Sequence, residues 1–417
     1  MRAWIVGLLL LLLPMACSEA KDESQDAGVD AICEEQVMHV VDIGPPDETF
    51  HVGPYLGHTT TDSVAISWES LGSGDTRLEY GADETLGLQV QGDAGTMHQV
   101  VLEGLSAGTR YFYKACTGTT CTGVLSFKTA PRPRTPFRFA VYGDTQDNPD
   151  IHAQVAAQTV ADQASLVIVV GDLVSDGNFR EQYKERFFDP ARAQAHSVPR
   201  YAAVGNHDRK DTDCVHFIDY MMFPEDPDVP QAEASYSFTY GDAFFLVFDN
   251  TLDHYDFFFP LAEGVDPLLW LWLQAQAQSE AAQNSRWRFA FAHYPADSNC
   301  YLDDNEYGPP ESAMRAYVLP MLWEAGFQGY FSGHQHCYER FDFDGHLVMT
   351  VGGGGGALEP QERCDDGLPE ARLQDCVHHH ALVEIGCEHA TIWGRDKDGR
   401  VIERLQLNQD GSHQVID

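Results

Sequence analysis

Five short apolar runs, each followed at once by a polar motif, constrain the fold of this 417-residue chain more than any other feature. The runs are residues 139–142, 166–170, 201–204, 289–292 and 329–332. Their length and residue types predict buried strands. The polar motifs are Gly143-Asp144, Gly171-Asp172, Gly205-Asn206-His207-Asp208, Ala292-His293-Tyr294-Pro295 and Gly333-His334-Gln335-His336. Because side chains at the carboxyl ends of strands can meet at one edge of a sheet, we expect these motifs to lie together.

The side chains in these motifs are carboxylates, an amide and imidazoles, which together suit a pair of divalent or trivalent metal ions. Two cations roughly 3.5–4 Å apart can hold both the attacking and the departing oxygen of an in-line phosphoryl displacement. A single Gly-Asp pair is more often a turn or a strand-end cap. Five motifs in this order favour a metal centre instead.

The motif order, and the sequence GHQHCYER at residues 333–340, resemble the calcineurin-like metallophosphoesterase superfamily and, within it, the purple acid phosphatases. The resemblance covers roughly residues 50–400. It implies an α/β fold, a four-layer α/β/β/α sandwich, with two metal ions (iron, zinc or manganese). The implied ligands are Asp144, Asp172, Asn206, His293, His334 and His336.

In this resemblance Asp172 bridges the two cations. Asp144 and His336 serve what we call the first metal site, and the second metal site is formed by Asn206, His293 and His334. The implied activity is the hydrolysis of phosphomonoesters by a metal-bound hydroxide.

His207 is implied as a catalytic residue that is not a ligand. It would hydrogen-bond the phosphoryl oxygen or protonate the leaving alkoxide. Four residues are candidates for the wall of the substrate site, namely Tyr294, Tyr301, Asp303 and Asp304, with Tyr294 as a candidate substrate contact. A structural role is favoured for each of them. The alternatives are a phosphodiesterase or nucleotidase that uses the same site, and a catalytically inactive surface module that binds a partner.

Two positions depart from the family pattern. Purple acid phosphatases carry a tyrosinate ligand three residues after the bridging aspartate, where this chain has Ser175. Other members of the superfamily carry a histidine two residues after the first aspartate, where this chain has Gln146. The amide of Gln146 is therefore the candidate fourth ligand of the first metal site. A neutral amide is a weaker ligand than tyrosinate or imidazole, which puts iron and the purple colour in question.

Residues 1–16 are predicted to be a signal peptide, because a short basic start precedes an apolar stretch too short to span a bilayer. Ala16 before Cys17 resembles a bacterial lipoprotein cleavage site, so Cys17 is the candidate lipidation residue; cleavage by an ordinary signal peptidase is the alternative. Residues 17–49 are rich in Asp and Glu and predict a solvated acidic tether. We expect an exported protein, either periplasmic, anchored as an outer membrane lipoprotein or extracellular, which meets a membrane only through Cys17.

Residues 50–130 predict an all-β domain, because apolar and polar residues alternate between glycine-rich turns. The stretch from Leu105 to Tyr113 is similar to the tyrosine corner of fibronectin type III domains, with Trp68 as the core tryptophan. A proline-rich linker at residues 130–136 separates it from a catalytic domain at 135–350, which residues 351–417 complete as a C-terminal β segment. Within the catalytic part, helices are predicted at 151–163, 180–188, 267–282 and 312–325.

A formal net charge of −38, from 26 basic and 64 acidic side chains, repels nucleic acid backbones. We therefore expect a small-molecule phosphate ester as the partner, and no nucleic acid. Ten cysteines in an exported chain predict disulfides, with Cys116–Cys121 and Cys364–Cys376 as plausible pairs. Cys337 is expected to be a buried thiol or part of a disulfide.

Two further features allow more than one interpretation. The glycine run 352–356 follows an apolar stretch, and is equally compatible with backbone amides that approach an anion and with a flexible turn near the metal centre. The run His378-His379-His380 precedes an apolar strand, and we favour packing over a second metal site.

Overall fold

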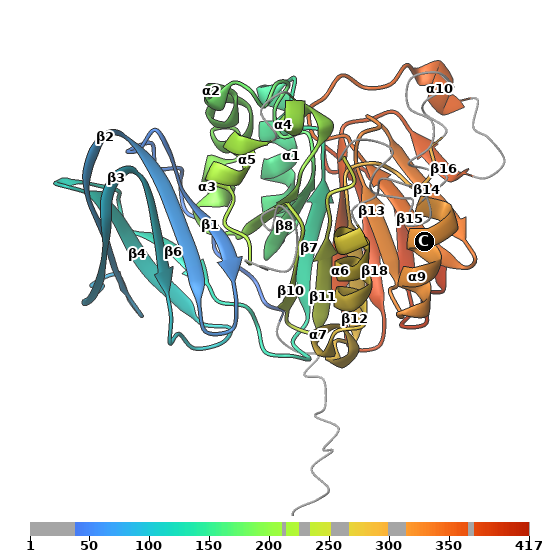
Figure 1. Ribbon diagram of the computed structural model, residues 1–417, viewed down its shortest axis with the longest axis horizontal. Coiled ribbons are helices and arrows are strands. Elements are labelled where there is room, and N and C mark those ends of the chain that lie inside the picture. Colours follow the sequence, from blue (N-terminus) through green and yellow to red (C-terminus); the bar gives the residue numbers. More distant parts are fainter. Residues whose placement is uncertain are drawn as a thin grey trace, which may run out of the picture. The chain divides into compact units, whose positions relative to one another are not determined.

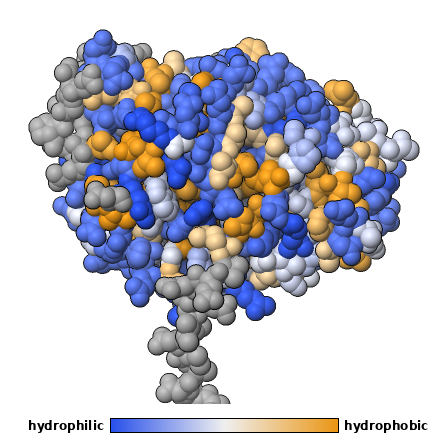
Figure 2. All heavy atoms as spheres, turned by 180° about the vertical axis from the view of Figure 1, so that it is seen from behind, coloured by the Kyte–Doolittle hydropathy of each residue, from blue (hydrophilic) through white to orange (hydrophobic). Residues whose placement is uncertain are grey.

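The structure is a computed structural model that describes residues 38–210, 214–224, 234–251, 267–298, 314–365 and 371–416. The predicted signal peptide, Cys17 and the acidic tether up to residue 37 lie outside the described residues. Across the described ranges, none of the helices is both long enough and apolar enough to cross a membrane. The face shown in Figure 2 is mostly hydrophilic, and its hydrophobic residues form separate groups.

The first part of the chain is all-β, as predicted (Figure 1). Its strands are β1 (Val52–Thr59), β2 (Val64–Gly81), β3 (Leu88–Leu102), β4 (Arg110–Thr117), β5 (Thr120–Cys121) and β6 (Leu125–Lys128). Strand β2 pairs with β1 through its first residues and with β4 through its last, so that β2 links these two strands in the sheet. The predicted tyrosine corner is present, since the Ser106 amide donates to the Tyr111 hydroxyl at 2.9 Å, and Trp68 is fully buried.

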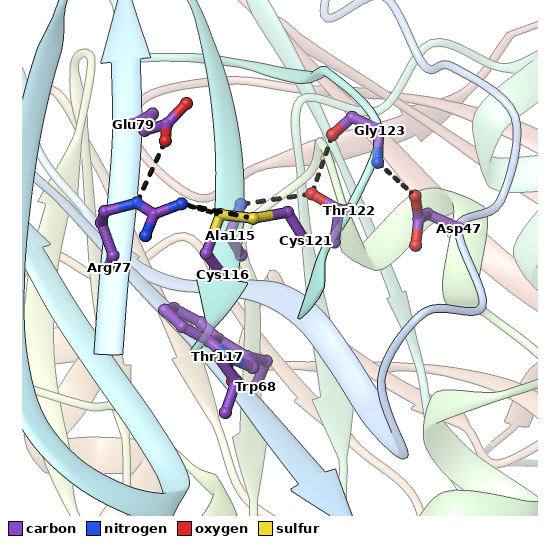
Figure 3. Close-up of a disulfide and its surroundings, with 10 residues drawn as sticks. All are labelled: Asp47, Trp68, Arg77, Glu79, Ala115, Cys116, Thr117, Cys121, Thr122 and Gly123. Atoms are coloured by element: carbon purple, nitrogen blue, oxygen red, sulfur yellow. Dashed lines mark hydrogen bonds and ion pairs between the residues drawn. A yellow bond between two sulfur atoms is a disulfide. The ribbon is translucent and has the colours of Figure 1, made fainter. Parts of the chain in front are cut away.

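A disulfide between two cysteines five residues apart closes a turn of this domain (Figure 3). Cys116 and Cys121 are bonded across the turn between β4 and β5, as the sequence predicted. The Arg77 guanidinium lies 3.3 Å from the sulfur of Cys116 and donates to Glu79 at 3.0 Å. The second predicted pair, Cys364–Cys376, is also bonded. Cys337, expected as a thiol or a disulfide, is disulfide-bonded, as is Cys387.

Among the described residues of the second part of the chain, the strands form two seven-stranded sheets. The first sheet has the order β20-β19-β18-β17-β7-β8-β9. Its strands are β7 (Phe137–Tyr142), β8 (Leu166–Val170), β9 (Arg200–Ala203), β17 (His379–Ile385), β18 (Ala390–Asp396), β19 (Val401–Leu407) and β20 (His413–Val415). Strands β7, β8 and β9 are parallel, so the loops that follow them lie at one edge.

The second sheet has the order β10-β11-β12-β13-β15-β14-β16. Its strands are β10 (Tyr236–Tyr240), β11 (Ala243–Val247), β12 (Trp287–Phe291), β13 (Gly329–Ser332), β14 (Tyr338–Phe343), β15 (His346–Val351) and β16 (Ala371–Asp375). Strands β11, β12, β13 and β15 are parallel. All five apolar runs identified in the sequence therefore lie in parallel strands. Three of these strands belong to the first sheet and two belong to the second.

Aromatic side chains fill the space between the two sheets. Phe139 of β7 makes edge-on contacts with Phe245 of β11 and Phe289 of β12, with ring centroids 5.1 and 5.4 Å apart. Alternate residues of β11 belong to a different core, in which Leu246 packs with Leu273 and Leu322 of the covering helices. This two-residue period places one face of the sheet against the other sheet and one against helices. The predicted α/β/β/α arrangement is confirmed.

The helices within the described residues are mostly short. They are α1 (Pro149–Ala161), α2 (Arg180–Gln182), the π-helix η1 (Tyr183–Phe188), α3 (Arg192–Ala195), α4 (Asn206–Arg209), α5 (Val215–Tyr220), α6 (Pro267–Ala277), α7 (Glu280–Asn284), the π-helix η3 (Met314–Val318), α9 (Leu319–Glu324) and α10 (Gln361–Asp365). Helix α1 begins two residues before the prediction, because the Asn148 side chain accepts a hydrogen bond from the Ile151 amide and Pro149 occupies the first turn. The helix predicted at 267–282 is interrupted, since Ser279 caps a new helix, α7.

Candidate metal centre

The predicted ligand residues follow the carboxyl ends of β7, β8, β9, β12 and β13. Asp144 and Asp172 each sit one residue beyond a glycine and have φ angles of 59° and 53°. His334 is likewise left-handed, with φ at 69°. Residues other than glycine seldom adopt this conformation, and it is concentrated at functional sites. Here it turns the chain sharply at the strand ends, so that the side chains meet at the seam of the two sheets.

The residues predicted for the second metal site lie together. The ligand atoms of Asp172, His293 and His334 are all within 4.8 Å of one another. The side-chain oxygen of Asn206 is 2.9 Å from His293 Nε2 and 3.1 Å from His334 Nδ1. His293 Nδ1 lies 2.8 Å from the Val170 carbonyl oxygen, which fixes the ring so that Nε2 faces the site.

The residues predicted for the first metal site also converge. His336 Nε2 is 3.4 Å from Asp144 Oδ1, while its Nδ1 lies 2.6 Å from the Ala357 carbonyl oxygen. The buried Gln146 side chain places its Nε2 atom 3.2 Å from His336 Nε2 and 3.5 Å from Asp172 Oδ2. Its Oε1 atom is buried, and no donor in the described ranges reaches it.

This geometry fits a cation beside Gln146. Amide oxygen and nitrogen are assigned from the surrounding hydrogen bonds, and the amide can be turned over. When the amide is turned over, the oxygen of Gln146 faces His336 and Asp172. These three side chains could then act as ligands of one cation. The two oxygens of Asp172 then face different sites, since Oδ1 is 3.4 Å from His293 Nε2 and Oδ2 is on the Gln146 side.

His207 lies beside these groups with its ring partly open to solvent. Its backbone amide donates to Asp172 Oδ1 at 2.8 Å, and its Nδ1 lies 2.7 Å from the Ser175 carbonyl oxygen. The other ring nitrogen, Nε2, is 4.0 Å from Asp172 Oδ2, and the side chain is 34% exposed. By contrast, Asp144, Asp172 and His293 are almost fully buried, and the side chain of His336 is 18% exposed.

Without a bound cation, protons on the histidine side chains offset the negative charge of the carboxylates at this site. Burial raises the pKa of Asp144, and for Asp172 the effect of burial is outweighed by His293, which holds that pKa below its usual range. Burial would lower the pKa of His293 and of His336, but Asp172 and Asp144 respectively raise each to about 9. Burial and the neighbouring His293 lower the pKa of His334 to about 3. A cation bound here would displace protons from His293 and His336.

Two buried residues that the sequence analysis did not single out as functional hold the ligand loops. Asn250 accepts hydrogen bonds from the amides of His293 and Tyr294 at 3.2 and 2.9 Å. Asp208 accepts from the amides of Leu173 and Gly205, which joins the loops after β8 and β9. Asn250 comes shortly after β11. Its position after a strand is the sequence feature that could have indicated its role.

The glycine run packs against the ligands. A Cβ atom at Gly356 would lie 2.6 Å from the His336 ring, and one at Gly352 would lie 2.7 Å from Asp144 Oδ2. The amides of Gly354 and Gly356 donate to the carbonyl oxygens of Gly143 and Asp144. These two amides are thus occupied, which favours the interpretation as a close-packed turn over anion binding.

Of the remaining predicted site residues, Tyr294 is buried with its ring edge-on to that of His334, 4.6 Å between centroids. Tyr301, Asp303 and Asp304 lie outside the described residues. In the histidine run, His380 Nε2 is 2.9 Å from Asp162 Oδ2 and His379 packs edge-on to Tyr338, in keeping with the favoured packing role.

Comparisons with known proteins identify two families along the chain. Residues 137–338 match the family described as Calcineurin-like phosphoesterase, and residues 50–129 match Purple acid Phosphatase, N-terminal domain. The chain is 24% identical over 308 residues to purple acid phosphatase 23 of Arabidopsis thaliana, covering 63% of each chain. It is 23% identical over 359 residues to purple acid phosphatase 18 of the same plant, covering 81% of this chain and 77% of the relative.

Two solved structures share the fold. Purple acid phosphatase PPD1 from yellow lupin seeds superposes with a TM-score of 0.70 at 18% identity, covering 84% of this chain and 73% of that one. PhoD superposes with a TM-score of 0.64 at 14% identity, covering 88% of this chain and 92% of that one. The chain therefore shares its overall fold with these two solved structures.

Proposed function

We propose that this chain, in which residues 137–338 match the calcineurin-like phosphoesterases and residues 50–129 match the purple acid phosphatase N-terminal domain, is a binuclear metallophosphatase that hydrolyses phosphomonoesters. The observation that carries the proposal is the convergence of ligand side chains from five strand ends. These are Asp144, Asp172, Asn206, His293, His334 and His336. Turn formers and strand caps would not need to meet at one point, so a structural role does not account for their arrangement.

We assign the bridging role to Asp172 because its two oxygens face opposite groups of donors. The second metal site comprises Asn206, His293 and His334 on the Oδ1 side. The first metal site comprises Asp144, His336 and the Gln146 amide on the Oδ2 side. Iron, zinc and manganese all accept such mixed oxygen and nitrogen donors. Bound cations would supply an acidified water as nucleophile and would neutralise charge that develops on the phosphoryl oxygens.

His207 is proposed as the residue that meets the substrate. Its hydrogen bond to the Ser175 carbonyl oxygen requires a proton on Nδ1, which orients Nε2 away from the backbone. With a second proton on the ring, Nε2 can donate to a phosphoryl oxygen or pass its proton to the leaving alkoxide. The partial exposure of this ring, beside buried ligands, supports a role in contact with substrate.

We further propose that the protein is exported and acts on small-molecule phosphate esters. The bonded pairs Cys116–Cys121 and Cys364–Cys376 support an oxidising compartment. Periplasmic, lipid-anchored and extracellular locations all agree with this, and acylation of Cys17 would be its membrane contact. The net charge of −38 argues against a nucleic acid partner.

A substrate panel tests the proposed reaction. The metal-loaded protein should release phosphate from p-nitrophenyl phosphate at least tenfold faster than it cleaves bis(p-nitrophenyl) phosphate, as judged by kcat/KM. Preference for the diester would assign a phosphodiesterase, and selective hydrolysis of nucleoside monophosphates would assign a nucleotidase. Absence of hydrolysis of every ester, with both cations bound, would support an inactive binding module and refute the proposed function.

A further inference from the structure

The position that holds a tyrosinate ligand in the resembled enzymes is tied to an arginine in this chain. The Ser175 hydroxyl lies 2.9 Å from Arg186 Nη1, 2.8 Å from the Gln146 carbonyl oxygen and 2.9 Å from Asp147 Oδ1. Two of these partners, Gln146 and Asp147, lie in the loop after β7. The third, Arg186, lies in the helical segment after β8. None of these three contacts is made with a metal-ligand atom.

Arg186 is a half-buried residue of the π-helix η1, whose geometry is rare and frequently found at functional sites. Its Nη1 atom also donates to the Gln146 carbonyl oxygen at 2.5 Å and to that of Asp147 at 3.4 Å. One nitrogen thereby joins both backbone carbonyls beside the Gln146 side chain to Ser175. The backbone of η1 is itself held, because the Arg186 carbonyl oxygen lies 2.8 Å from Nδ1 of the buried His152.

The loop held by Arg186 also reaches His336, another ligand of the first metal site. The Ala357 amide lies 3.4 Å from Asp147 Oδ2, and the Ala357 carbonyl oxygen accepts from His336 Nδ1 at 2.6 Å. On the other side, the Ser175 carbonyl oxygen accepts from His207 Nδ1. Movement of the Gln146–Asp147 loop would therefore disturb Gln146 directly and His336 through Ala357.

We propose that Arg186 is a positioning residue for the first metal site, a role that rests on the proposed binuclear centre. The amide of Gln146 is a weak ligand, and its long side chain loses rotational freedom when it binds a cation. By fixing the Gln146 backbone from two sides, the Arg186 guanidinium and the Ser175 hydroxyl reduce the loop motion that binding must suppress. This chain compensates for a weak ligand by holding it rigidly, because partners outside the coordination shell orient the ligands inside it.

The test measures cation binding rather than turnover. Native protein and the variant Arg186→Met are loaded with Mn²⁺ and exposed to a graded series of a competing chelator, and bound Mn²⁺ per chain is measured. We expect two ions in both when no chelator is present. In Arg186→Met one ion should leave at a chelator concentration about 10–100-fold lower than in the native protein, and the other should be retained. Ser175→Ala should shift the same ion in the same direction, by a smaller factor.

Arg288→Met is the matched control, because Arg288 is also half-buried and donates to backbone carbonyls, those of Ala282 and Ala325. It lies near the start of β12, at the end of the strand away from His293. It should lower the unfolding temperature without changing the release of either ion. Should Arg186→Met fail to fold, Arg186→Lys carries the same test, with an intermediate shift expected.

Two results would overturn the inference in different ways. Unchanged release of both ions in Arg186→Met and Ser175→Ala would refute the role of Arg186 while leaving the binuclear centre intact. A native protein that never holds a second ion would refute the binuclear centre, and with it this role.

Discussion

Asn206 Oδ1 lies 2.9 Å from His293 Nε2, although the two residues follow strands of different sheets. Asn206 follows β9 at the edge of the first sheet, and His293 follows β12 inside the second. A cation held by both would join the two sheets at their common edge. A cation bound at the candidate metal centre would therefore contribute to the packing between the sheets, and bound metal should stabilise the fold by mass action.

Asp172 is proposed as the carboxylate that bridges the two cations. Asp172→Asn should abolish turnover and lower the bound metal below two ions per chain, because a neutral amide cannot neutralise two cations. Metal content and phosphate release, measured on the same preparation, check this. A variant with two ions and near-native turnover would show that Asp172 is not the bridge.

His207→Ala should separate metal binding from catalysis. His207 is proposed as a proton donor and not a ligand, so the metal content should stay at the native value while kcat falls by about 10²–10⁴-fold. His389→Ala, at an exposed histidine in the turn between β17 and β18, should change neither quantity. Loss of metal from His207→Ala would mean that this histidine is a ligand.

The visible spectrum tests the interpretation of Ser175. The purple of the resembled enzymes comes from charge transfer between tyrosinate and ferric iron, and a serine hydroxyl produces no such band. We expect colourless or yellow protein with any metal, and we expect a chelator to empty the first metal site before the second. Ser175→Tyr should tighten iron binding and create colour if the tyrosine reaches the metal. An intense purple band in the native protein would mean that another tyrosine is a ligand.

Acid should destabilise the fold partly through His379. Burial lowers the pKa of His379 to about 3, whereas an unfolded histidine titrates near 6.5. Because only the unfolded chain gains this proton between those values, the contribution is complete above about pH 6.5 and is lost by about 1.4 kcal/mol per pH unit below it. Compared at equal metal loading, the loss of unfolding free energy from pH 7 to pH 5 should be about 2 kcal/mol smaller in His379→Asn. Equal losses in both proteins would assign the acid sensitivity to other groups.

Much of the fold could be predicted, because strands end where apolar runs give way to glycine and polar ligands. Asp144, Asp172, Asn206, His293, His334 and His336 all follow such runs, and parallel pairing brings the ends together. The disulfide Cys116–Cys121 was equally visible, since it closes a short turn. These features depend on local sequence or on a repeated local pattern.

The supports of the site could not be predicted in the same way. Arg186 acts through backbone carbonyl oxygens of a distant loop, and Asn250 through backbone amides beside His293, so the partners carry no side-chain signature. The glycine run gave an ambiguous signal, because close packing and anion binding both favour glycine. The close approach of Asp144 and His336 to Gly352 and Gly356, together with the occupied amides of Gly354 and Gly356, distinguishes the two.

The central claim is that two cations held by this centre carry out phosphate ester hydrolysis. The most direct measurement titrates metal-stripped protein with Mn²⁺ or Zn²⁺ and records, at each step, the ions bound per chain and the rate of phosphate release from p-nitrophenyl phosphate. The account predicts no activity without metal and a rate that rises with the second ion to full activity at two per chain. Full activity in stripped protein, or at a single ion per chain, would contradict it.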